Sequence, residues 1–366
     1  MRTSSVYIHV PFCESKCPYC AFKSAVKRNG DEELYIRATA GEAALRSPEA
    51  GVLKTLYIGG GTPSALSVES WKTLTEAIDR SFILADDAEI TLEANPGSIT
   101  EEHIALWSAW RVNRVSVGAQ SFLDGDLKFL GRIHGADQAN DAVRSCIDAG
   151  FSVSLDLMFG LPRGTLRDWA SSLGAALALR PHHISVYQLS IEPGTPFAKK
   201  NFDLPDGYAQ YRYAQWRLPR AGYGQYEVAS FALHGNESRH NLNYWADEEY
   251  IGIGPSAWSC RGGTRRMNAP GLDEYVKMIE DKGSAAVYEE RLDDERAARQ
   301  AAVLALRTSG GIDWGSFTAR HGEDSAKEIK KELEKFPSSL IERSETRARL
   351  TPKGLRVGNA IWSELI

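Results

Sequence analysis

The sequence predicts an α/β fold built as a partial (β/α)6 TIM-like barrel. Short apolar β-like runs alternate with amphipathic helical patterns along residues 6–189. Polar and glycine-rich residues follow the ends of several runs, where parallel α/β folds place their ligands. Strand–helix units in series imply a parallel sheet with right-handed crossovers. An open doubly wound sheet fits the same pattern, so the barrel is a prediction from the number of units.

The predicted strands are short and rich in Val, Ile and Leu. In chain order they are Val6–Val10, Lys54–Ile58, Glu89–Glu93, Arg114–Val117, Ser152–Met158 and His183–Leu189. The helical patterns between them include Ser67–Phe82, Thr100–Trp110 and Asp137–Ala149. Gly150 follows the last of these helices as a plausible C-terminal cap.

The regular alternation of strand and helix patterns ends after about Leu204. An aromatic-rich segment, Tyr208–Trp216, precedes a glycine-rich stretch, Gly252–Trp258. We therefore predict a core barrel over residues 1–204 and an extension that closes the barrel over residues 205–290.

Residues 291–366 predict a small winged-helix-like module. Their pattern is a charged helix from about Asp293, a helix over Asp324–Lys335, a hairpin and strand over Ser344–Leu350 and a final helix from Pro352. Such modules often bind DNA, but this one has no concentrated basic face. We interpret it as a packing or partner module.

Composition and charge are those of an ordinary globular protein. Of 366 residues, 43% are hydrophobic and 25% charged, and the net charge is −5. This mild charge gives no electrostatic reason to expect a nucleic-acid or membrane partner. The first ten residues are too short for a signal-peptide core, and no apolar run could span a bilayer. The predicted location is the cytoplasm.

The strongest chemical signal is a group of three cysteines directly after the first strand. Cys13, Cys17 and Cys20 have the spacing Cys-x3-Cys-x2-Cys, which in a reducing compartment indicates metal ligation. Three thiolates can hold three irons of a [4Fe–4S] cluster and leave the fourth iron open. The amino and carboxylate groups of S-adenosylmethionine (SAM) can fill that position, and an electron from the reduced cluster can then release a 5′-deoxyadenosyl radical.

A structural zinc site is the alternative for these cysteines. It requires a fourth Cys or a suitably placed His. His9 is close in sequence, but it lies within the first strand, so the sheet sets its direction. Surface cysteines without a role are a second alternative. The cluster is the favoured interpretation.

The residues around the cysteines resemble a known family. Tyr7-Ile-His9-Val-Pro-Phe-Cys13, followed by Cys17-Pro-Tyr-Cys20, is identified as a radical SAM motif. It is similar to the anaerobic, oxygen-independent coproporphyrinogen III oxidase family, HemN and its relatives. The resemblance extends from Tyr7 through the C-terminal module, and it implies the barrel fold, a [4Fe–4S] cluster and SAM.

The resemblance also implies a set of SAM-binding residues. The second predicted strand ends in Gly59-Gly60-Gly61-Thr62-Pro63, where glycines allow close approach of the backbone to a ligand. Glu93, at the end of the third strand, can accept hydrogen bonds from ribose hydroxyls. The full predicted set is Tyr7, Tyr19, Gly60, Gly61, Thr62, Glu93, Gln120, Arg132, Asp156, Gln188 and Trp258. Alternatively, Arg132 and Asp156 form a buried ion pair that stabilises the barrel.

Three departures from HemN favour the HemW branch, whose members are heme chaperones. Phe22 stands where HemN enzymes carry an additional cysteine. Tyr7 lies almost at the start of the chain, whereas HemN enzymes have a long N-terminal arm. His240-Asn-Leu-Asn-Tyr244-Trp245 resembles the His-Asn-x-x-Tyr-Trp motif of HemW.

A heme site is implied mainly by this resemblance. His240 is the tentative iron ligand, with Tyr244 as a stacking residue, since His, Tyr and Cys ligate heme iron. The alternative is that both residues close one end of the barrel through hydrogen bonds to the backbone. Cys260 and the other histidines are further candidates. Cys146 lies on an apolar helix face and is predicted to belong to the core.

Two functions follow from the residues and the resemblance. The first is a heme chaperone that transfers heme to an acceptor protein, with a cluster and SAM that assist or regulate the transfer. The second is an enzyme, either an oxygen-independent coproporphyrinogen III dehydrogenase or another HemN-like radical SAM enzyme. The chaperone is preferred, no catalytic residue is assigned, and the acceptor protein and the electron donor are left unidentified.

Overall fold

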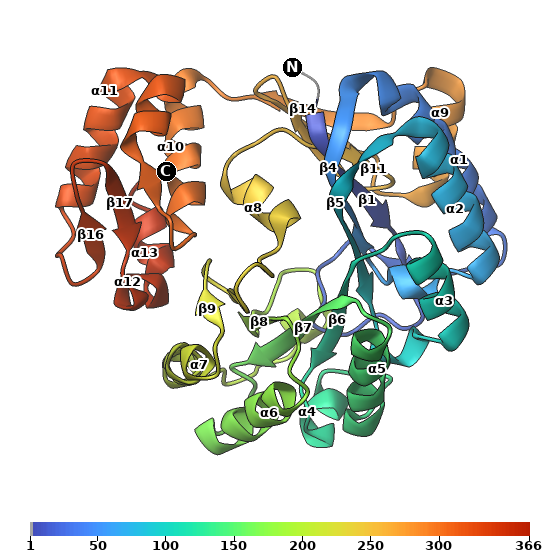
Figure 1. Cartoon of the computed structure of the whole chain (residues 1–366), viewed down its shortest axis with the longest axis horizontal. Helices are drawn as coiled ribbons and strands as arrows, with labels where there is room; N and C mark the ends of the chain where they lie inside the picture. Colours follow the sequence, from blue (N-terminus) through green and yellow to red (C-terminus); the bar gives the residue numbers. More distant parts are fainter. Residues whose placement is uncertain (1–2) are drawn as a thin grey trace.

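The structure is a computed structural model that describes residues 3–366. Residues 1 and 2 of the predicted core lie outside the described residues. The chain forms a nine-stranded sheet with the order β11-β1-β4-β5-β6-β7-β8-β10-β9, and the sheet curves into an open barrel with helices outside it (Figure 1). Its first six strands in chain order are β1 (Thr3–Val10), β4 (Ala50–Gly60), β5 (Ile83–Ala94), β6 (Arg114–Gln120), β7 (Ser152–Phe159) and β8 (His183–Gln188).

These six strands are the predicted ones, and each pairs in parallel with the next along the chain. The sequential order confirms the barrel, because a doubly wound sheet reverses its strand order at a switch point. β4 and β5 begin earlier than predicted, at Ala50 and Ile83, because each pairs with its neighbour past an irregularity in register.

Helices cover the outer side of the barrel (Figure 1). They are α1 (Asp31–Arg46), α2 (Val68–Ser81), α3 (Glu101–Ala109), α4 (Asp124–Phe129), α5 (Ala136–Asp148), α6 (Leu166–Ala178) and α7 (Tyr208–Arg220). The predicted helices match α2, α3 and α5. Side chains of Ser67 and Thr100 cap α2 and α3 by accepting a backbone N–H three residues on.

The strands alternate between an apolar outer face and a polar inner face. In β1, Val6, Ile8 and Val10 are fully buried in the core between sheet and helices. Ser5 and Tyr7, at the alternate positions, contact side chains of β4 inside the barrel. Because the inner positions of β5, β6, β7 and β8 are also largely polar, the interior holds a cavity instead of a packed core.

Segments from the middle of the chain complete both edges of the sheet. β11 (Ile251–Ile253) adds in parallel beside β1, and β10 (Ser230–Ala232) and β9 (Gly224–Gln225) add in antiparallel fashion beside β8. Two short strands, β2 (Phe12–Cys13) and β3 (Ala25–Val26), pair at the base of the cysteine loop. Helix α8 (Arg239–Trp245) follows β10.

A second small sheet lies beside β11. Its strands are β12 (Trp258–Arg261), β13 (Thr264–Asn268) and β14 (Ala286–Arg291), and α9 (Leu272–Lys282) packs against α1. Glu42 of α1 anchors this region to the barrel. Its buried carboxylate accepts hydrogen bonds from Gly254 N at 2.8 Å, Asn268 Nδ2 at 2.8 Å and Tyr275 Oη at 2.7 Å.

Replacing Glu42 with Ala is expected to lower the free energy of unfolding by about 2 kcal/mol, because three buried donors lose their acceptor. Urea unfolding of the purified chain measures this loss. Glu33→Ala provides the control, since Glu33 is exposed on the same helix. Equal midpoints for Glu42→Ala and Glu33→Ala would contradict the assigned anchoring role.

The C-terminal segment forms a module with its own hydrophobic core. Its elements are α10 (Asp294–Leu306), β15 (Ile312–Asp313), α11 (Trp314–Glu334), β16 (Ile341–Arg343), β17 (Arg347–Leu350), α12 (Pro352–Arg356) and α13 (Gly358–Trp362). Asp293 caps α10, as the predicted start of that helix requires. The predicted helix over Asp324–Lys335 is only the second half of α11, because the chain departs from helical geometry at Gly322 (φ 85°) and the turns before it were not predicted.

The module contacts the barrel through a guanidinium held between two indoles. The Arg307 guanidinium lies 4.8 Å from the Trp245 ring centre and 4.6 Å from that of Trp362.

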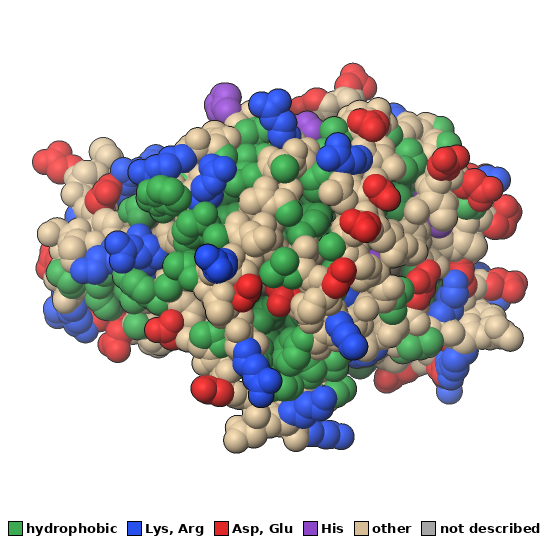
Figure 2. All heavy atoms as spheres, turned by 90° about the horizontal axis from the view of Figure 1, so that it is seen from below, with side chains coloured by type: hydrophobic (Ala, Val, Ile, Leu, Met, Phe, Trp, Pro, Cys, Tyr) green, Lys and Arg blue, Asp and Glu red, His purple; other side chains and the backbone are tan. Residues whose placement is uncertain are grey.

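The face in Figure 2 carries Lys and Arg intermingled with Asp and Glu, with hydrophobic side chains between them. Among residues 3–366, no helix combines the length and apolar character that a membrane crossing requires.

Candidate cofactor site

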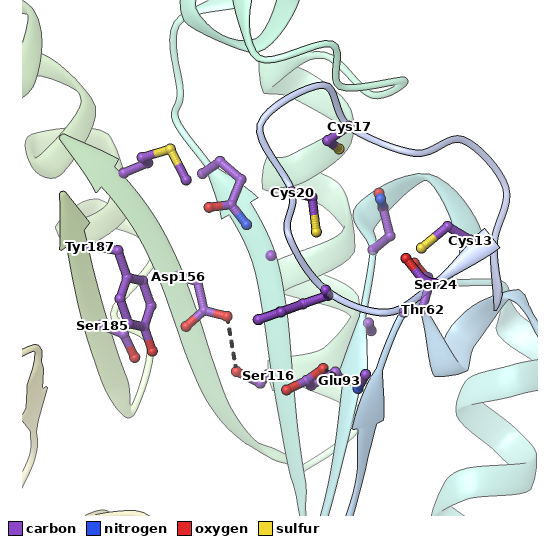
Figure 3. A pocket seen from close by; sticks show the side chains of 18 of the residues that line it. Cys13, Cys17, Cys20, Ser24, Thr62, Glu93, Ser116, Asp156, Ser185 and Tyr187 are labelled. Carbon is purple, nitrogen blue, oxygen red and sulfur yellow. Dashed lines mark hydrogen bonds between the residues drawn. The ribbon is translucent and has the colours of Figure 1, made fainter. Parts of the chain in front are cut away.

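The three motif cysteines lie at the mouth of one cavity inside the barrel (Figure 3). Cys13 ends β2, and a turn joins Cys17 to Cys20 through a backbone hydrogen bond of 3.1 Å. All three thiols are half-buried and free of disulfides. Lys16 closes the loop by donating from Nζ to the carbonyl oxygens of Phe22 and Ser24. The sequence prediction that these cysteines converge on one site is therefore consistent with the geometry.

His9 is not positioned as a fourth ligand. Its Nδ1 lies 2.9 Å from Tyr7 Oη and its Nε2 lies 3.0 Å from the Lys23 carbonyl oxygen, so both ring nitrogens are engaged. Within residues 3–366, no three His, Cys, Asp or Glu side chains gather as one zinc ion requires. In a [4Fe–4S] cluster each thiolate binds a different iron, so the three thiols need not lie close enough to bind one ion together. The donor set fits the cluster better than zinc.

The cavity has a volume of about 550 Å³, which is in the range of small-molecule sites. It extends from the cysteine loop down to Ser238 and Asn241 near the start of α8. Of the predicted SAM residues, the cavity is lined by Tyr19, Gly60, Gly61, Thr62, Glu93, Gln120, Arg132, Asp156 and Gln188.

Glu93 is the central acceptor of this cavity. Its Oε1 accepts a hydrogen bond from Tyr57 Oη at 2.7 Å, and its Oε2 accepts one from Gly60 N at 3.0 Å. Burial raises the pKa of Glu93 from its usual 4.5 to about 7, partly offset by these two donors, and nearby Asp156 raises it further. Each oxygen keeps a lone pair for a hydroxyl of a bound ligand.

Asp156 and Arg132 both line the cavity but do not form the ion pair considered as the alternative. Arg132 Nη1 donates to Cys17 Sγ at 3.3 Å, and its Nη2 donates to the Gly118 carbonyl oxygen at 2.8 Å. Ser116 Oγ donates to Asp156 at 3.3 Å. Burial raises the pKa of Asp156 to about 6, and hydrogen bonds and Arg132 only partly offset this. Arg132 thus places positive charge beside a thiol of the cysteine loop.

The glycine loop is packed tightly against the root of the cysteine loop. A Cβ on Gly61 would lie 2.3 Å from the Phe12 carbonyl oxygen, and Gly60 has φ +112°, which side chains rarely tolerate. Backbone hydrogen bonds run from Gly61 N to Val10 O and from Thr62 N to Phe12 O. The absence of a side chain at Gly61 therefore allows the glycine loop to pack against the backbone of Phe12. This packing fixes the loop that faces the cavity.

Gln120 adopts a left-handed backbone conformation, with φ +67°, at an irregularity in the pairing of β6 and β7. Such conformations carry strain and cluster at functional sites. The bulge turns the end of β6 toward the cavity, where the sequence prediction placed this residue.

Two predicted SAM residues do not line the cavity. Tyr7 packs against Tyr57, with ring centres 6.0 Å apart, and hydrogen-bonds to His9. Trp258 begins β12 of the small sheet, where its ring lies edge-to-face on Tyr288 at 5.5 Å and is 40% exposed. Trp258 is therefore not part of the cavity lining, and its contact with SAM stays a prediction.

His240 and Tyr244 lie at the closed end of the barrel. His240 is fully buried, with Nδ1 2.9 Å from Thr55 Oγ1 and Nε2 2.8 Å from Tyr244 Oη. Burial lowers the pKa of His240 to about 3, so the ring is neutral. Neither ring nitrogen is available to heme iron in this structure. His240 and Tyr244 therefore fit the alternative in which they close one end of the barrel through hydrogen bonds, although these bonds go to side chains instead of the backbone.

Several cavity residues were missed by the sequence analysis. They are Tyr57, Ser116, Ser154, Met158, Ser185 and Tyr187. The available signal was their spacing: polar residues two apart in otherwise apolar strands point to the same face. Asp156 was recognised, so Ser154 and Met158, two positions either side of it in β7, follow from the same alternation.

Comparison with known proteins places this site in a family. The profile of the radical SAM superfamily matches residues 7–175, and that of the HemN C-terminal domain matches residues 292–357. The chain is 34% identical to the heme chaperone HemW of Bacillus subtilis over 99% of both chains. It is 42% identical to HemW of Escherichia coli over 69% of each chain.

Among solved structures, the fold matches coproporphyrinogen III oxidase (HemN) from Escherichia coli, described as a radical SAM enzyme. The TM-score is 0.88, with 23% identity over 100% of this chain and 90% of that one. This likeness concerns the fold alone. The sequence similarities over full length decide the family: the chain belongs to the radical SAM superfamily, carries a HemN C-terminal domain and is a member of the HemW family.

Proposed function

We propose that this protein is a heme chaperone, which binds heme and transfers it to an acceptor protein. The observation that carries the proposal is the similarity to HemW of Bacillus subtilis over 99% of both chains. Phe22 supports it, since this position lacks the additional cysteine that the sequence analysis associated with HemN enzymes. The acceptor protein and the electron donor are not specified by the residues. We also propose a cytoplasmic location, because the spacing of the three cysteines suits metal ligation, which a reducing compartment permits.

We further propose that Cys13, Cys17 and Cys20 hold a [4Fe–4S] cluster. When bound, a reduced cluster supplies the electron for reductive cleavage of SAM. The chain's own residues prepare the site. Arg132 donates to Cys17 Sγ, and His9 braces the loop through the Lys23 carbonyl.

SAM is proposed to occupy the cavity below the cysteine loop. Glu93 would accept hydrogen bonds from the ribose hydroxyls, and Tyr57 and Gly60 N hold its carboxylate in place. Thr62, Gln120, Arg132, Asp156 and Gln188 surround the remaining space. Thr62 is buried and Gln120, Arg132 and Asp156 are half-buried, so their contacts with a charged ligand are stronger than in bulk water.

The second candidate function is oxidative decarboxylation of coproporphyrinogen III. It is favoured by one observation: the cavity retains every predicted cluster ligand and the buried carboxylates Glu93 and Asp156. A passive heme carrier has no chemical need for these groups.

One experiment separates the two functions. The full chain, reconstituted anaerobically with iron and sulfide, is given reductant, SAM and coproporphyrinogen III, and separately titrated with hemin. A chaperone is expected to bind hemin saturably at about one per chain and to form no protoporphyrinogen. Catalytic yields of protoporphyrinogen, or hemin binding that never saturates, would overturn the proposal.

A further inference from the structure

One face of the small sheet beside the barrel carries two exposed aromatic side chains, Trp258 and Tyr288. In the register of β12, β13 and β14, Trp258 lies opposite Met267, and Met267 lies opposite Tyr288. In the next row on the same face, Cys260 lies opposite Arg265. We call these five residues the Trp258 face. Side chains alternate along strands, so the intervening residues point to the other side.

The first row of the Trp258 face is apolar and exposed. Trp258 is 40% exposed and Tyr288 is 43% exposed, and their rings lie edge-to-face with centres 5.5 Å apart. Met267 is partly buried between them. Two exposed aromatic rings flanking a flexible thioether are typical of a surface that receives a flat apolar ligand.

The second row adds a thiol and a guanidinium. Cys260 is a half-buried free thiol. Within residues 3–366, Arg265 makes no ion pair, since the neighbouring Glu290 binds Arg296 at 3.0 Å instead. Asp247 and Glu249 also face this region, and burial together with Asp247 raises the pKa of the Cys260 thiol while Arg265 lowers it. Arg265 lies opposite Glu290 and hydrogen-bonds to the Cys260 thiol, and its guanidinium keeps further N–H donors for a ligand carboxylate.

The HemW-like motif of α8 lies beside Cys260, on the side to which the Tyr250 side chain points. Tyr250 exchanges both backbone hydrogen bonds with Cys260, each of 3.0 Å. The Tyr250 ring packs edge-to-face on Tyr244 at 4.6 Å, and Tyr244 hydrogen-bonds to His240. Asn243 Nδ2 donates to the Glu249 carbonyl oxygen. Residues paired directly across antiparallel strands point to the same face, so Tyr250 lies beside Cys260 and the α8 motif flanks the Trp258 face.

Resting on the proposed heme-chaperone function, we propose that heme binds on the Trp258 face. The macrocycle lies against Trp258, Met267 and Tyr288, Cys260 ligates the iron, and Arg265 pairs with a propionate. The chemistry matches on three counts: heme has a broad apolar plane, an iron that accepts Cys sulfur and two carboxylates at one edge. In this arrangement α8 flanks the binding surface, and His240 supplies no iron ligand.

The test is a hemin titration of the full-length, cluster-reconstituted chain, followed by difference absorption and by electron paramagnetic resonance of the ferric iron. Cys260→Ala is expected to weaken hemin binding about tenfold and to abolish the thiolate signature of the iron. Cys260→His is expected to restore tight binding with a changed spectrum. Cys146→Ala is the matched control, since Cys146 is buried in the barrel, and it should bind hemin like the unaltered chain.

Arg265 and Trp258 are tested separately. Arg265→Gln is expected to weaken binding of hemin, but not of hemin dimethyl ester, which lacks free carboxylates. Trp258→Ala is expected to weaken both ligands. Cluster iron content verifies that each variant is folded.

The outcomes are distinct for the site and for the function. Absence of saturable hemin binding in the unaltered chain contradicts the heme-chaperone function itself. If the unaltered chain binds hemin and Cys260→Ala and Trp258→Ala bind it equally well, the Trp258 face is wrong and the function stands. Loss of the iron signature in folded His240→Ala, but not in Cys260→Ala, assigns the ligand to His240 instead.

Discussion

Cys17→Ala is expected to reduce bound iron and sulfide from roughly four of each per chain to almost none after anaerobic reconstitution. Each of the three cysteines at the cavity mouth would hold a different iron, so no neighbouring side chain can replace a missing thiolate. His9, the nearest candidate, has both ring nitrogens engaged by Tyr7 and the Lys23 carbonyl. Iron and sulfide analysis and the visible absorption of the reconstituted protein measure the loss.

Cys260→Ala and Cys146→Ala are the matched controls for this variant. Both remove a thiol outside the cysteine loop, so both should retain the full cluster. A Cys17→Ala chain with undiminished iron and sulfide, or an unaltered chain that contains zinc instead, would sink the assignment of the cluster ligands.

Glu93→Ala is expected to weaken SAM binding about a hundredfold, because two charge-assisted hydrogen bonds of about 1.5 kcal/mol each are lost. Glu93 lies in the cavity with both oxygens already oriented by Tyr57 and Gly60 N. Equilibrium dialysis with labelled SAM measures the affinity. Glu69→Ala, at an exposed position on α2, should leave it unchanged. Equal affinities for the two variants would remove Glu93 from the SAM site.

The raised pKa of the Glu93 carboxyl predicts that SAM affinity depends on pH. Its pKa in the folded protein is about 7, so about half of the chains carry protonated Glu93 at neutral pH. Since the ionised form is the acceptor for ribose, SAM affinity should rise about tenfold between about pH 6 and about pH 8. Glu93→Gln should flatten this profile. A profile equally steep in the variant would attribute the dependence to another group.

For stability the sign is the opposite. A carboxyl whose pKa is raised from 4.5 to about 7 on folding binds its proton more tightly in the folded state. Its contribution to stability is fully present below about pH 4.5 and is lost as the pH rises to about 7. The pH that favours SAM binding is therefore the pH at which Glu93 contributes least to folding, and Glu93→Gln should remove this part of the dependence in urea unfolding.

The series of apolar strand patterns separated by helical patterns predicted the barrel, because strands that pack against helices must carry apolar residues. Val6, Ile8 and Val10 show this pattern, and they are fully buried. Helix starts were predictable where a side chain caps the helix, as Ser67 and Thr100 do. The first half of α11 was missed because Gly322 interrupts the helix and local sequence does not reveal that it resumes in line.

The sequence by itself determined the chemistry of the cysteine loop and the family. The spacing of Cys13, Cys17 and Cys20 after a strand is a local property of the chain, and nearest-neighbour geometry is enough to bring the three thiols together. The positions of Glu93 and Gln120 at strand ends also followed, since parallel strands place those ends at one edge, and Asp156 was predicted on a barrel strand. Only the folded structure shows which polar side chains already have hydrogen-bond partners within the protein. It engaged both nitrogens of His240 with Thr55 and Tyr244, and it turned Trp258 out of the barrel onto the small sheet. These contacts join residues up to 185 positions apart, and only the folded chain brings such residues within hydrogen-bonding distance.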